Sequence, residues 1–277
     1  MLKKTSPGSA FAYALIVLVT LATLFPLAWM VLTAIKPTQE IYSPTASWLP
    51  SVIDWTHLKT AWVEKNFSLY FVNSLLISLV TATFSTAVAI LGGYALARFE
   101  FPGKRILGAF VLLIYLVPVI LLALPFYLLL SGLGLLDTRM GLVLAVATYA
   151  VPFSVWVLKG YFAQVPPEIE EAAVVDGASR VGALWHVVLP VALPGIVATF
   201  LFSFILAWDD YLFALIIVNS DSIRTLPLAV GLLASDYVIS DGLMMAMGTI
   251  TTIPIVLLYL FFQRYFISGL TAGSVKG

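Results

Sequence analysis

Long runs of apolar residues alternate along the chain with short polar joints that contain proline, glycine and charged residues. Six of these runs can cross a bilayer, because its hydrocarbon core of about 30 Å needs about 20 helical residues. The strands of a membrane barrel would instead show short segments of alternating polarity. The pattern therefore predicts an all-α polytopic bundle of about six transmembrane helices, with one transmembrane domain over residues 1–277. The expected spans lie approximately over residues 11–35, 69–97, 106–130, 140–158, 191–218 and 243–262.

The composition supports a membrane protein and narrows its chemistry. Hydrophobic residues form 61% of the chain and charged residues 10%, with a mean hydropathy of +1.05, whereas soluble domains carry about 25% charged residues. The formal net charge is zero, so no overall field favours nucleic acid as a partner. The chain has no cysteine, and His57 and His186 stand alone in the sequence. We therefore expect no metal site.

The distribution of basic residues predicts the orientation of the chain. The first apolar run follows Lys3 and Lys4 but is far longer than the roughly 7–15 apolar residues of a signal peptide, so we expect an uncleaved span. With six spans, nine lysines and arginines fall on the side of both termini and five fall on the other side. Because basic residues accumulate in cytoplasmic loops, this bias places both termini in the cytoplasm.

The joint at residues 165–190, between the fourth and fifth expected spans, carries the most specific pattern. Pro167 suits the first turn of a helix, and the glutamates after it favour the positive end of the helix dipole. Gly177 suits the exit from that helix, and Ser179 can cap a second one. The second helix would carry one apolar face, formed by Val181, Leu184, Trp185 and Val188.

The same joint contains a spaced motif. Glu171-Ala172-Ala173 is followed after three residues by Gly177, and after nine more by Val187-Val188-Leu189-Pro190. This spacing resembles the EAA loop of bacterial ABC importer permeases, here with Val187 in place of the usual isoleucine. The resemblance implies a coupling helix that docks on an ATPase subunit. The residues that it assigns to docking are Glu171, Ala172, Ala173, Asp176, Gly177, Leu189 and Pro190.

Other stretches are similar to one subgroup of that family, the carbohydrate importers of the maltose, trehalose and oligosaccharide type. The chain resembles their smaller, six-span permease, which lies in the bacterial or archaeal cytoplasmic membrane. The stretches that carry this resemblance are Asn73-Ser74-Leu75, Tyr94 to Arg105, Gly134 to Thr138, and Gly269 to Gly277.

The resemblance also implies the partners. A second permease subunit, two copies of a cytoplasmic ATPase and an extracytoplasmic sugar-binding protein would complete the importer. The ATPase subunits would bind ATP and Mg, so we expect neither a cofactor nor enzymatic activity in this chain. The C-terminal tail would contact the ATPase through Gly273, Val275 and Lys276.

Two acidic residues fall inside the fifth expected span. A charge in the bilayer costs about 2.5–3.5 kcal/mol on insertion scales and usually faces a cavity or a partner. Asp209 and Asp210 are therefore candidates for a sugar translocation path, together with the adjacent Trp208, whose ring could stack on a sugar. The alternatives are a position near the outer interface or a bond to a partner helix. Tyr115 and Asn73 are the other path candidates.

A secondary transporter driven by an ion gradient is the alternative function. It predicts intramembrane ion sites and inverted repeats, and the sequence shows neither beyond the aspartate pair. Pro118 and Pro125 permit a kink in the third expected span, either as a flexing gate or as a static bend. The favoured prediction is a permease that couples ATP hydrolysis in partner subunits to alternating access for a maltose- or trehalose-like sugar.

Overall fold

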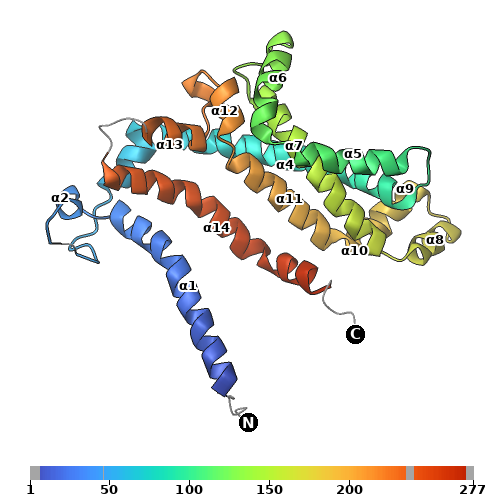
Figure 1. Ribbon diagram of the computed structural model, residues 1–277, viewed down its shortest axis with the longest axis horizontal. Coiled ribbons are helices and arrows are strands. Elements are labelled where there is room, and N and C mark those ends of the chain that lie inside the picture. The colour runs from blue at the N-terminus through green and yellow to red at the C-terminus, as the bar shows by residue number, and fades with distance from the viewer. Residues whose placement is uncertain (1–6, 46, 235–239, 273–277) are drawn as a thin grey trace. The chain divides into compact units, whose positions relative to one another are not determined.

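The computed structural model describes residues 7–45, 47–234 and 240–272, and all regular structure in these residues is helical. Four of the described helices are individually long and apolar enough to cross a membrane, and two bent helix pairs raise the number of candidate spans to six. This agrees with the predicted helical bundle of about six spans. The four long helices, labelled in Figure 1, are α1 (Pro7–Ala34), α4 (Phe67–Arg98), α7 (Arg139–Gln164) and α14 (Asp241–Ala272).

The chain forms two compact units. The first comprises Met1–Ser68 with Leu232–Ile253, and the second comprises Leu69–Gly231 with Pro254–Gly277. Helix α14 contributes residues to both units. The second unit contains the 165–190 joint and the path candidates, so it is the part of the fold that positions the candidate sites.

Helix α7 is central to the second unit. It packs against α5 (Lys104–Leu116) and against α11 (Leu193–Trp208). Small residues permit the close approach: a Cβ at Gly195 of α11 would overlap the ring of Tyr161, and the hydroxyls of Ser154 and Ser203 lie 3.0 Å apart across the two helices. Small side chains at helix contacts are typical of membrane bundles, in which close packing replaces the hydrophobic effect.

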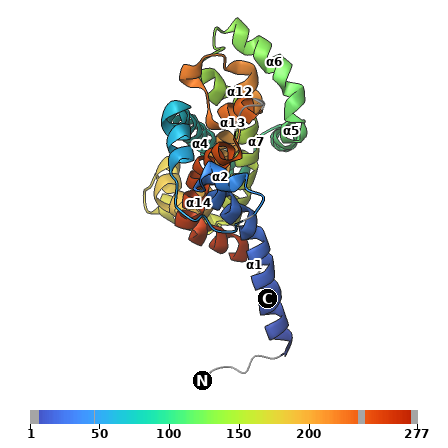
Figure 2. The ribbon, with the colours of Figure 1, turned by 90° about the vertical axis from the view of Figure 1, so that its left-hand side faces the viewer.

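The third expected span, 106–130, is divided into two helices. Helices α5 and α6 (Val119–Gly132) meet at an angle of 99°. The sharp bend between them can be followed in both ribbon views (Figures 1 and 2). The break falls at Val117 and Pro118, where Val117 is extended. A residue before proline is disfavoured in helical conformation, and proline donates no backbone hydrogen bond. Pro118 therefore marks the bend, whereas Pro125 lies inside α6.

The fifth expected span, 191–218, is also shorter than the apolar pattern suggested. Helix α11 ends at Trp208, and the separate α12 (Leu212–Ile217) follows it. The carboxylate of Asp210 accepts bonds from the amides of Phe213 and Ala214 at 3.5 and 3.0 Å, so it satisfies the free N–H groups of a new helix start. Two short helices then occupy the expected polar joint, η3 (Asp221–Ile223) and α13 (Leu226–Ala234).

Four short elements form the joint between α7 and α11. The segment ends in a 79° bend at Ala192, before α11 begins. The turns from Leu184 to Val188 are π-helical, a conformation that is rare and concentrated at functional positions. The elements are α8 (Pro167–Val175), α9 (Arg180–Ala183), η2 (Leu184–Val188) and α10 (Leu189–Val191).

The first unit combines α1 and the start of α14 with three short segments, α2 (Thr38–Ile41), α3 (Thr56–Lys59) and the π-helical η1 (Thr60–Glu64). The ring of His57 packs so closely on Gly242 that a Cβ there would overlap it, and its Nε2 lies 3.4 Å from the hydroxyl of Thr38. His57 is therefore a packing residue. The apolar side chains of α1 are largely exposed, as expected for a helix covered by lipid or by another subunit.

Candidate functional site: the coupling loop

The loop over residues 165–190 begins where α7 stops. Val165 is extended ahead of Pro166, and Pro167 occupies the first turn of α8, so helix α7 cannot continue through them. Glu168 and Glu170 lie in the first turn of α8, where the helix dipole favours negative charge. The predicted start of the first short helix is thus confirmed.

Glu170 fastens this helix to the end of α4. Its Oε2 accepts from Nε of Arg98 at 2.9 Å, and its Oε1 accepts from the hydroxyl of Tyr94. Arg98 also donates from Nη2 to the carbonyl of Val165 at 2.7 Å. Both side chains of the ion pair are largely buried. One arginine therefore holds the end of α7 and the start of α8 against α4.

The exit from α8 is a glycine turn. Gly177 has φ of +94°, a left-handed conformation that disfavours residues with a Cβ. The amide of Gly177 donates to the carbonyl of Val174 at 3.0 Å, and that of Ala178 donates to Ala173 at 2.9 Å. This is the Schellman arrangement, which satisfies the last carbonyls of a helix. A Cβ at Gly177 would meet nothing within 4 Å, so the requirement for glycine comes from the backbone angle alone.

The second half of the loop differs from the expected single apolar face. Ser179 caps α9 by accepting from the amide of Gly182 at 3.1 Å, as predicted. However, Leu184 and Val188 are buried in a core cluster with Tyr94 and other residues of α4 and α7, whereas Val181 and Trp185 are 65% and 58% exposed. The two i,i+4 pairs face different ways, and only the exposed pair is available to a partner. These residues were expected to share one face, but the structure divides them into one buried pair and one exposed pair.

The docking residues divide in the same manner. Glu171, Ala172 and Asp176 lie on the exposed side of α8 and its exit, with Val175 beside them at 85% exposure. Ala173 is half-buried, and Pro190 is exposed at the start of α10. Leu189 is buried in the same cluster as Val188, so its side chain holds the loop to the bundle.

A hollow of about 460 Å³ opens beside α8. It lies between the Arg98–Glu170 pair and the exposed side of the helix. Its lining combines the apolar side chains of Val174 and Val175 with the opposite charges of Glu171 and Arg180. A hollow lined by both apolar and charged side chains suits a protruding side chain of another protein.

The path candidates lie in different surroundings. Trp208 is fully buried, with its ring stacked 5.7 Å from that of Phe204. Asp210 is buried and accepts from the hydroxyl of Tyr149 at 3.4 Å in addition to the α12 amides. Both therefore serve packing and backbone satisfaction in this structure, although we expected them to face a path. Asp209 is exposed at the end of α11.

Asn73 and Tyr115 complete this set. Asn73 is buried, donates to the carbonyls of Ser222 and Arg224 at 3.0 and 2.9 Å, and accepts from Arg139 at 2.9 Å. It is a structural clamp, a role that its position in the sequence did not indicate. Tyr115 is partly exposed near the end of α5, with its ring 5.1 Å from Phe153 of α7. The expected tail residues Gly273, Val275 and Lys276 lie outside the described residues.

Comparisons with known proteins identify the family of the chain. Residues 89–271 match the family model described as "Binding-protein-dependent transport system inner membrane component". This match covers about two thirds of the chain and includes the whole loop. The chain belongs to this family.

Two relatives and one solved structure extend the likeness over the full length of the permease. The diacetylchitobiose uptake system permease protein DasC of Streptomyces coelicolor is 34% identical over 100% of both chains. The trehalose/maltose transport system permease protein MalG of Thermococcus litoralis is 33% identical over 94% of both. A subunit of a bacterial ABC transporter that imports the acidic polysaccharide alginate shares the fold, with a TM-score of 0.80 at 22% identity over 96% of this chain and 99% of that one.

Membership of this family fixes the general role of the chain. It is a multi-pass inner-membrane permease of a binding-protein-dependent ABC transporter, and it works with a periplasmic binding protein and ATPase partners. ATP hydrolysis belongs to those ATPase partners and not to the permease. Membership of the family also excludes the alternative function, an autonomous transporter driven by an ion gradient.

The ion pair between Arg98 and Glu170 could not be predicted from the sequence. In the sequence Glu170 is one of three glutamates that follow Pro167, and Arg98 lies within the stretch from Tyr94 to Arg105 that resembles the carbohydrate importers. The two residues are 72 positions apart, and helical periodicity relates residues only within one element. One signal for this pair was present in the sequence: a basic residue ends one expected span, and an acidic residue follows another. The predicted topology puts both residues on the same side of the membrane.

Proposed function

We propose that this permease imports a disaccharide or short oligosaccharide of the maltose and trehalose type, paired with a second permease and two ATPase subunits. The proposal rests on the loop at 165–190. Contacts within the second unit hold its backbone, and its outer face is exposed. The relatives DasC and MalG are named for diacetylchitobiose and for trehalose and maltose. All three are disaccharides, which supports this substrate class for the chain.

In the proposed mechanism α8 docks in a cleft of one ATPase subunit. Glu171 and Asp176 supply charge, and Val175 and Trp185 supply the apolar contact that their exposure leaves available. When ATP closes the ATPase dimer, the docked α8 moves with its cleft. The Glu170–Arg98 pair and the Arg98–Val165 bond pass that displacement to α4 and α7 together. Such a bundle needs two packed states whose balance nucleotide shifts.

The proposed orientation places the loop and both termini in the cytoplasm. The chain has no native cysteine, so a single introduced cysteine reports accessibility. In vesicles that contain the permease without its ATPase subunits, Val175→Cys in the loop should react with an impermeant maleimide only when the vesicles are inside-out. Val63→Cys, on an exposed residue of η1, is the matched control and should react only in right-side-out vesicles. Labelling of Val175→Cys from the outside would exclude docking on a cytoplasmic ATPase.

Docking is tested by reversing one exposed charge. Glu171→Lys in the reconstituted transporter should lower sugar-stimulated ATP hydrolysis at least about tenfold, because loss of a charge contact at an interface costs roughly 2–5 kcal/mol. Glu64→Lys makes the same charge change on an exposed residue outside the loop and should retain activity. Full activity of Glu171→Lys with normal assembly would remove Glu171 from the docking contact.

The sugar contact of this subunit is proposed for Asp209 and Tyr115, the two exposed members of the candidate set. A carboxylate accepts hydrogen bonds from sugar hydroxyls, and an aromatic ring stacks on a sugar face. Asp209→Ala should raise the KM for uptake while leaving assembly unchanged. Asp241→Ala, an exposed aspartate at the start of α14, is its control. Binding of a disaccharide panel to the cognate binding protein would identify the substrate itself.

A further inference from the structure

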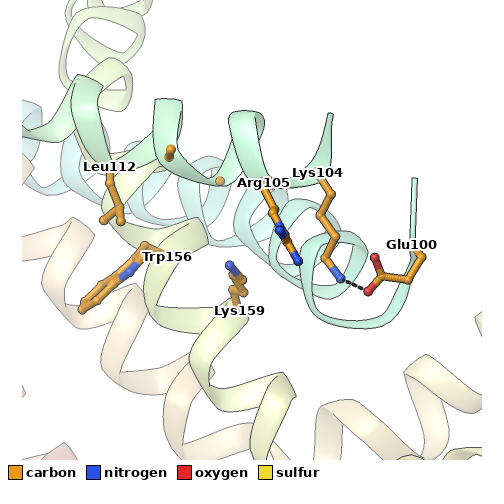
Figure 3. Close-up of a pocket in the computed structure, with 8 residues that line it drawn as sticks. Glu100, Lys104, Arg105, Leu112, Trp156 and Lys159 are labelled. Atoms are coloured by element: carbon orange, nitrogen blue, oxygen red, sulfur yellow. Dashed lines mark hydrogen bonds and ion pairs between the residues drawn. The ribbon is translucent and has the colours of Figure 1, made fainter. Parts of the chain in front are cut away.

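A second hollow lies between α5 and α7, at the end of the unit that carries the coupling loop. Its volume is about 420 Å³, and Figure 3 shows the side chains around it. Helix α5 begins six residues after α4 ends, and Lys159 lies five residues before the end of α7. The hollow therefore sits near the membrane surface on the side of the loop. The lining residues that bear on its chemistry are Lys104, Arg105, Gly108, Leu112, Trp156 and Lys159.

Positive charge dominates one end of this hollow. Lys104 is paired with Glu100, with Nζ 2.8 Å from Oε1. The lysine also holds the pKa of the Glu100 carboxyl below its usual range, so this carboxylate stays ionised. Arg105 and Lys159 form no ion pair with any carboxylate in the described parts of the chain. Three cations and one carboxylate leave a surplus of two positive charges.

The other end of the hollow is apolar. Figure 3 places Leu112 and Trp156 at the end away from Glu100, with Arg105 and Lys159 between. Trp156 is 49% exposed, and Phe110 and Leu113 expose apolar side chains along the same helix as Leu112. Tryptophan at such a boundary is typical of the membrane–water interface. The hollow is thus amphipathic along its length.

Gly108 makes room for the central cation. A Cβ at Gly108 would lie 3.6 Å from Nζ of Lys159, so the ammonium group occupies the space beside a residue without a side chain. The Lys159 side chain extends from α7 toward α5 (Figure 3). A longer side chain at residue 108 would displace this ammonium and fill the hollow.

We propose that this hollow binds the phosphate headgroup of an anionic membrane phospholipid such as phosphatidylglycerol, between Arg105 and Lys159, with an acyl chain against Leu112 and Trp156. Basic pockets between membrane helices on the cytoplasmic side are suited to such headgroups. Inorganic phosphate carries the same anionic group as the headgroup but has no acyl chain to contact the apolar end of the hollow. The assignment rests on the proposed orientation, which puts the hollow at the cytoplasmic leaflet.

Lipid retention by the assembled transporter tests the site. The complex is exchanged into detergent with defined mixtures of phosphatidylglycerol and phosphatidylcholine, and retained lipid is measured by native mass spectrometry. The wild-type complex should retain phosphatidylglycerol preferentially. Arg105→Gln with Lys159→Gln should weaken the apparent affinity for it on the order of thirtyfold, because each basic residue near an anionic surface contributes about 1 kcal/mol.

Matched variants separate the site from general charge. Lys59→Gln with Lys65→Gln removes the same net charge from exposed residues of the first unit and should keep the preference. Gly108→Leu keeps every charge but fills the hollow, so it should lose phosphatidylglycerol to the same extent as the charge variant. Equal retention by the wild type and both pocket variants would overturn the proposal.

A cysteine in the hollow distinguishes the two phosphate sources. Ala109→Cys should be protected from maleimide by phosphatidylglycerol but not by millimolar inorganic phosphate. Equal protection by phosphate alone would overturn the lipid assignment in favour of a soluble anion. These lipid measurements need neither sugar nor ATP. A negative lipid result would therefore not affect the proposed docking of Glu171, and a negative docking result would not affect the lipid measurements.

Discussion

The second unit is clamped at both ends of α4, and the two clamps are built differently. Near the start of α4, which we call the distal end, the amide of Asn73 binds the carbonyls of Ser222 and Arg224 and accepts from Arg139. At the coupling end, Arg98 pairs with Glu170 and binds the Val165 carbonyl. The 25 residues from Asn73 to Arg98 span roughly 37 Å of helix, so the two clamps are farther apart than the roughly 30 Å of a hydrocarbon core.

The difference suits the two ends to different roles. The distal clamp is a buried neutral amide whose bonds each require a narrow geometry, so it holds one arrangement. The coupling clamp is an ion pair, whose attraction falls off slowly with distance and survives small rotations. It also leaves Val175 and Trp185 exposed. The distal end therefore fixes shape, and the exposed side of the coupling end remains available for the proposed docking on an ATPase.

Removing Arg98 should give the largest effect. Arg98→Ala leaves Glu170 largely buried without its partner, and breaking a buried pair costs about 3–5 kcal/mol. We expect the loop to detach from α4 and sugar uptake per ATP hydrolysed to fall at least about tenfold, a difference of about 1.4 kcal/mol. Parallel assays of uptake and ATP hydrolysis in proteoliposomes measure that ratio.

The control is Lys65→Ala, which truncates an exposed basic residue of the first unit. Reversing the pair, Arg98→Glu with Glu170→Arg, should restore part of the coupling. If Arg98→Ala keeps the normal ratio of uptake to hydrolysis, the Arg98–Glu170 pair does not transmit the movement of the ATPase to the helices of the permease.

Removing Asn73 should lower stability more than it alters coupling. Asn73→Ala removes its bonds to two carbonyls and to the Arg139 guanidinium, at about 1–3 kcal/mol in total, because Arg139 and Ser222 are exposed and still bond each other. We expect Tm to fall by roughly 5–10 °C with an unchanged uptake ratio. Asn219→Ala, an exposed asparagine, is the matched control. An unchanged Tm with a raised KM for sugar would instead return Asn73 to the translocation path.

Gly177 gives a smaller and purely conformational effect. Gly177→Ala places a Cβ at φ of +94°, where residues other than glycine cost of order 1–3 kcal/mol. We expect a Tm lowered by a few degrees and weaker ATPase docking. Gly160→Ala, in helical conformation with open space around its Cβ, should be neutral or stabilising. Equal Tm values for the two variants would show that the α8 exit relaxes without cost.

The sequence predicted the coupling end better than the distal end because the coupling loop is organised locally. Pro167, Gly177 and Ser179 act within four residues of themselves, so their roles follow from position. Asn73 acts on Ser222 and Arg224, about 150 residues away, and no periodicity reports such a contact. The kink at Pro118 was predicted from the proline itself. The break at Asp209 was not, since an apolar run does not distinguish one straight helix from two separate ones.

The smallest expected effect is at Asp137, which reinforces the distal end. Its carboxylate accepts from the amides of Asn219 and Ser220, both at 2.8 Å, and from the Ser220 hydroxyl. These bonds hold the pKa of Asp137 below its usual 3.8, so their stabilising contribution is complete above that value and is lost as pH falls through the lowered pKa. Asp137→Asn keeps a residue that tolerates its left-handed backbone but removes the charge.

The Tm difference between wild type and Asp137→Asn should therefore be constant from pH 7 to about 5 and shrink as the pH drops below the usual carboxyl value of 3.8. Asp241→Asn, at an exposed aspartate, controls for the loss of one charge. If the Tm difference stays constant into the acid range, the negative charge of the Asp137 carboxylate does not contribute to stability. The rigidity of the distal end would then depend on Asn73 alone, and the contrast with the ionic coupling end would become sharper.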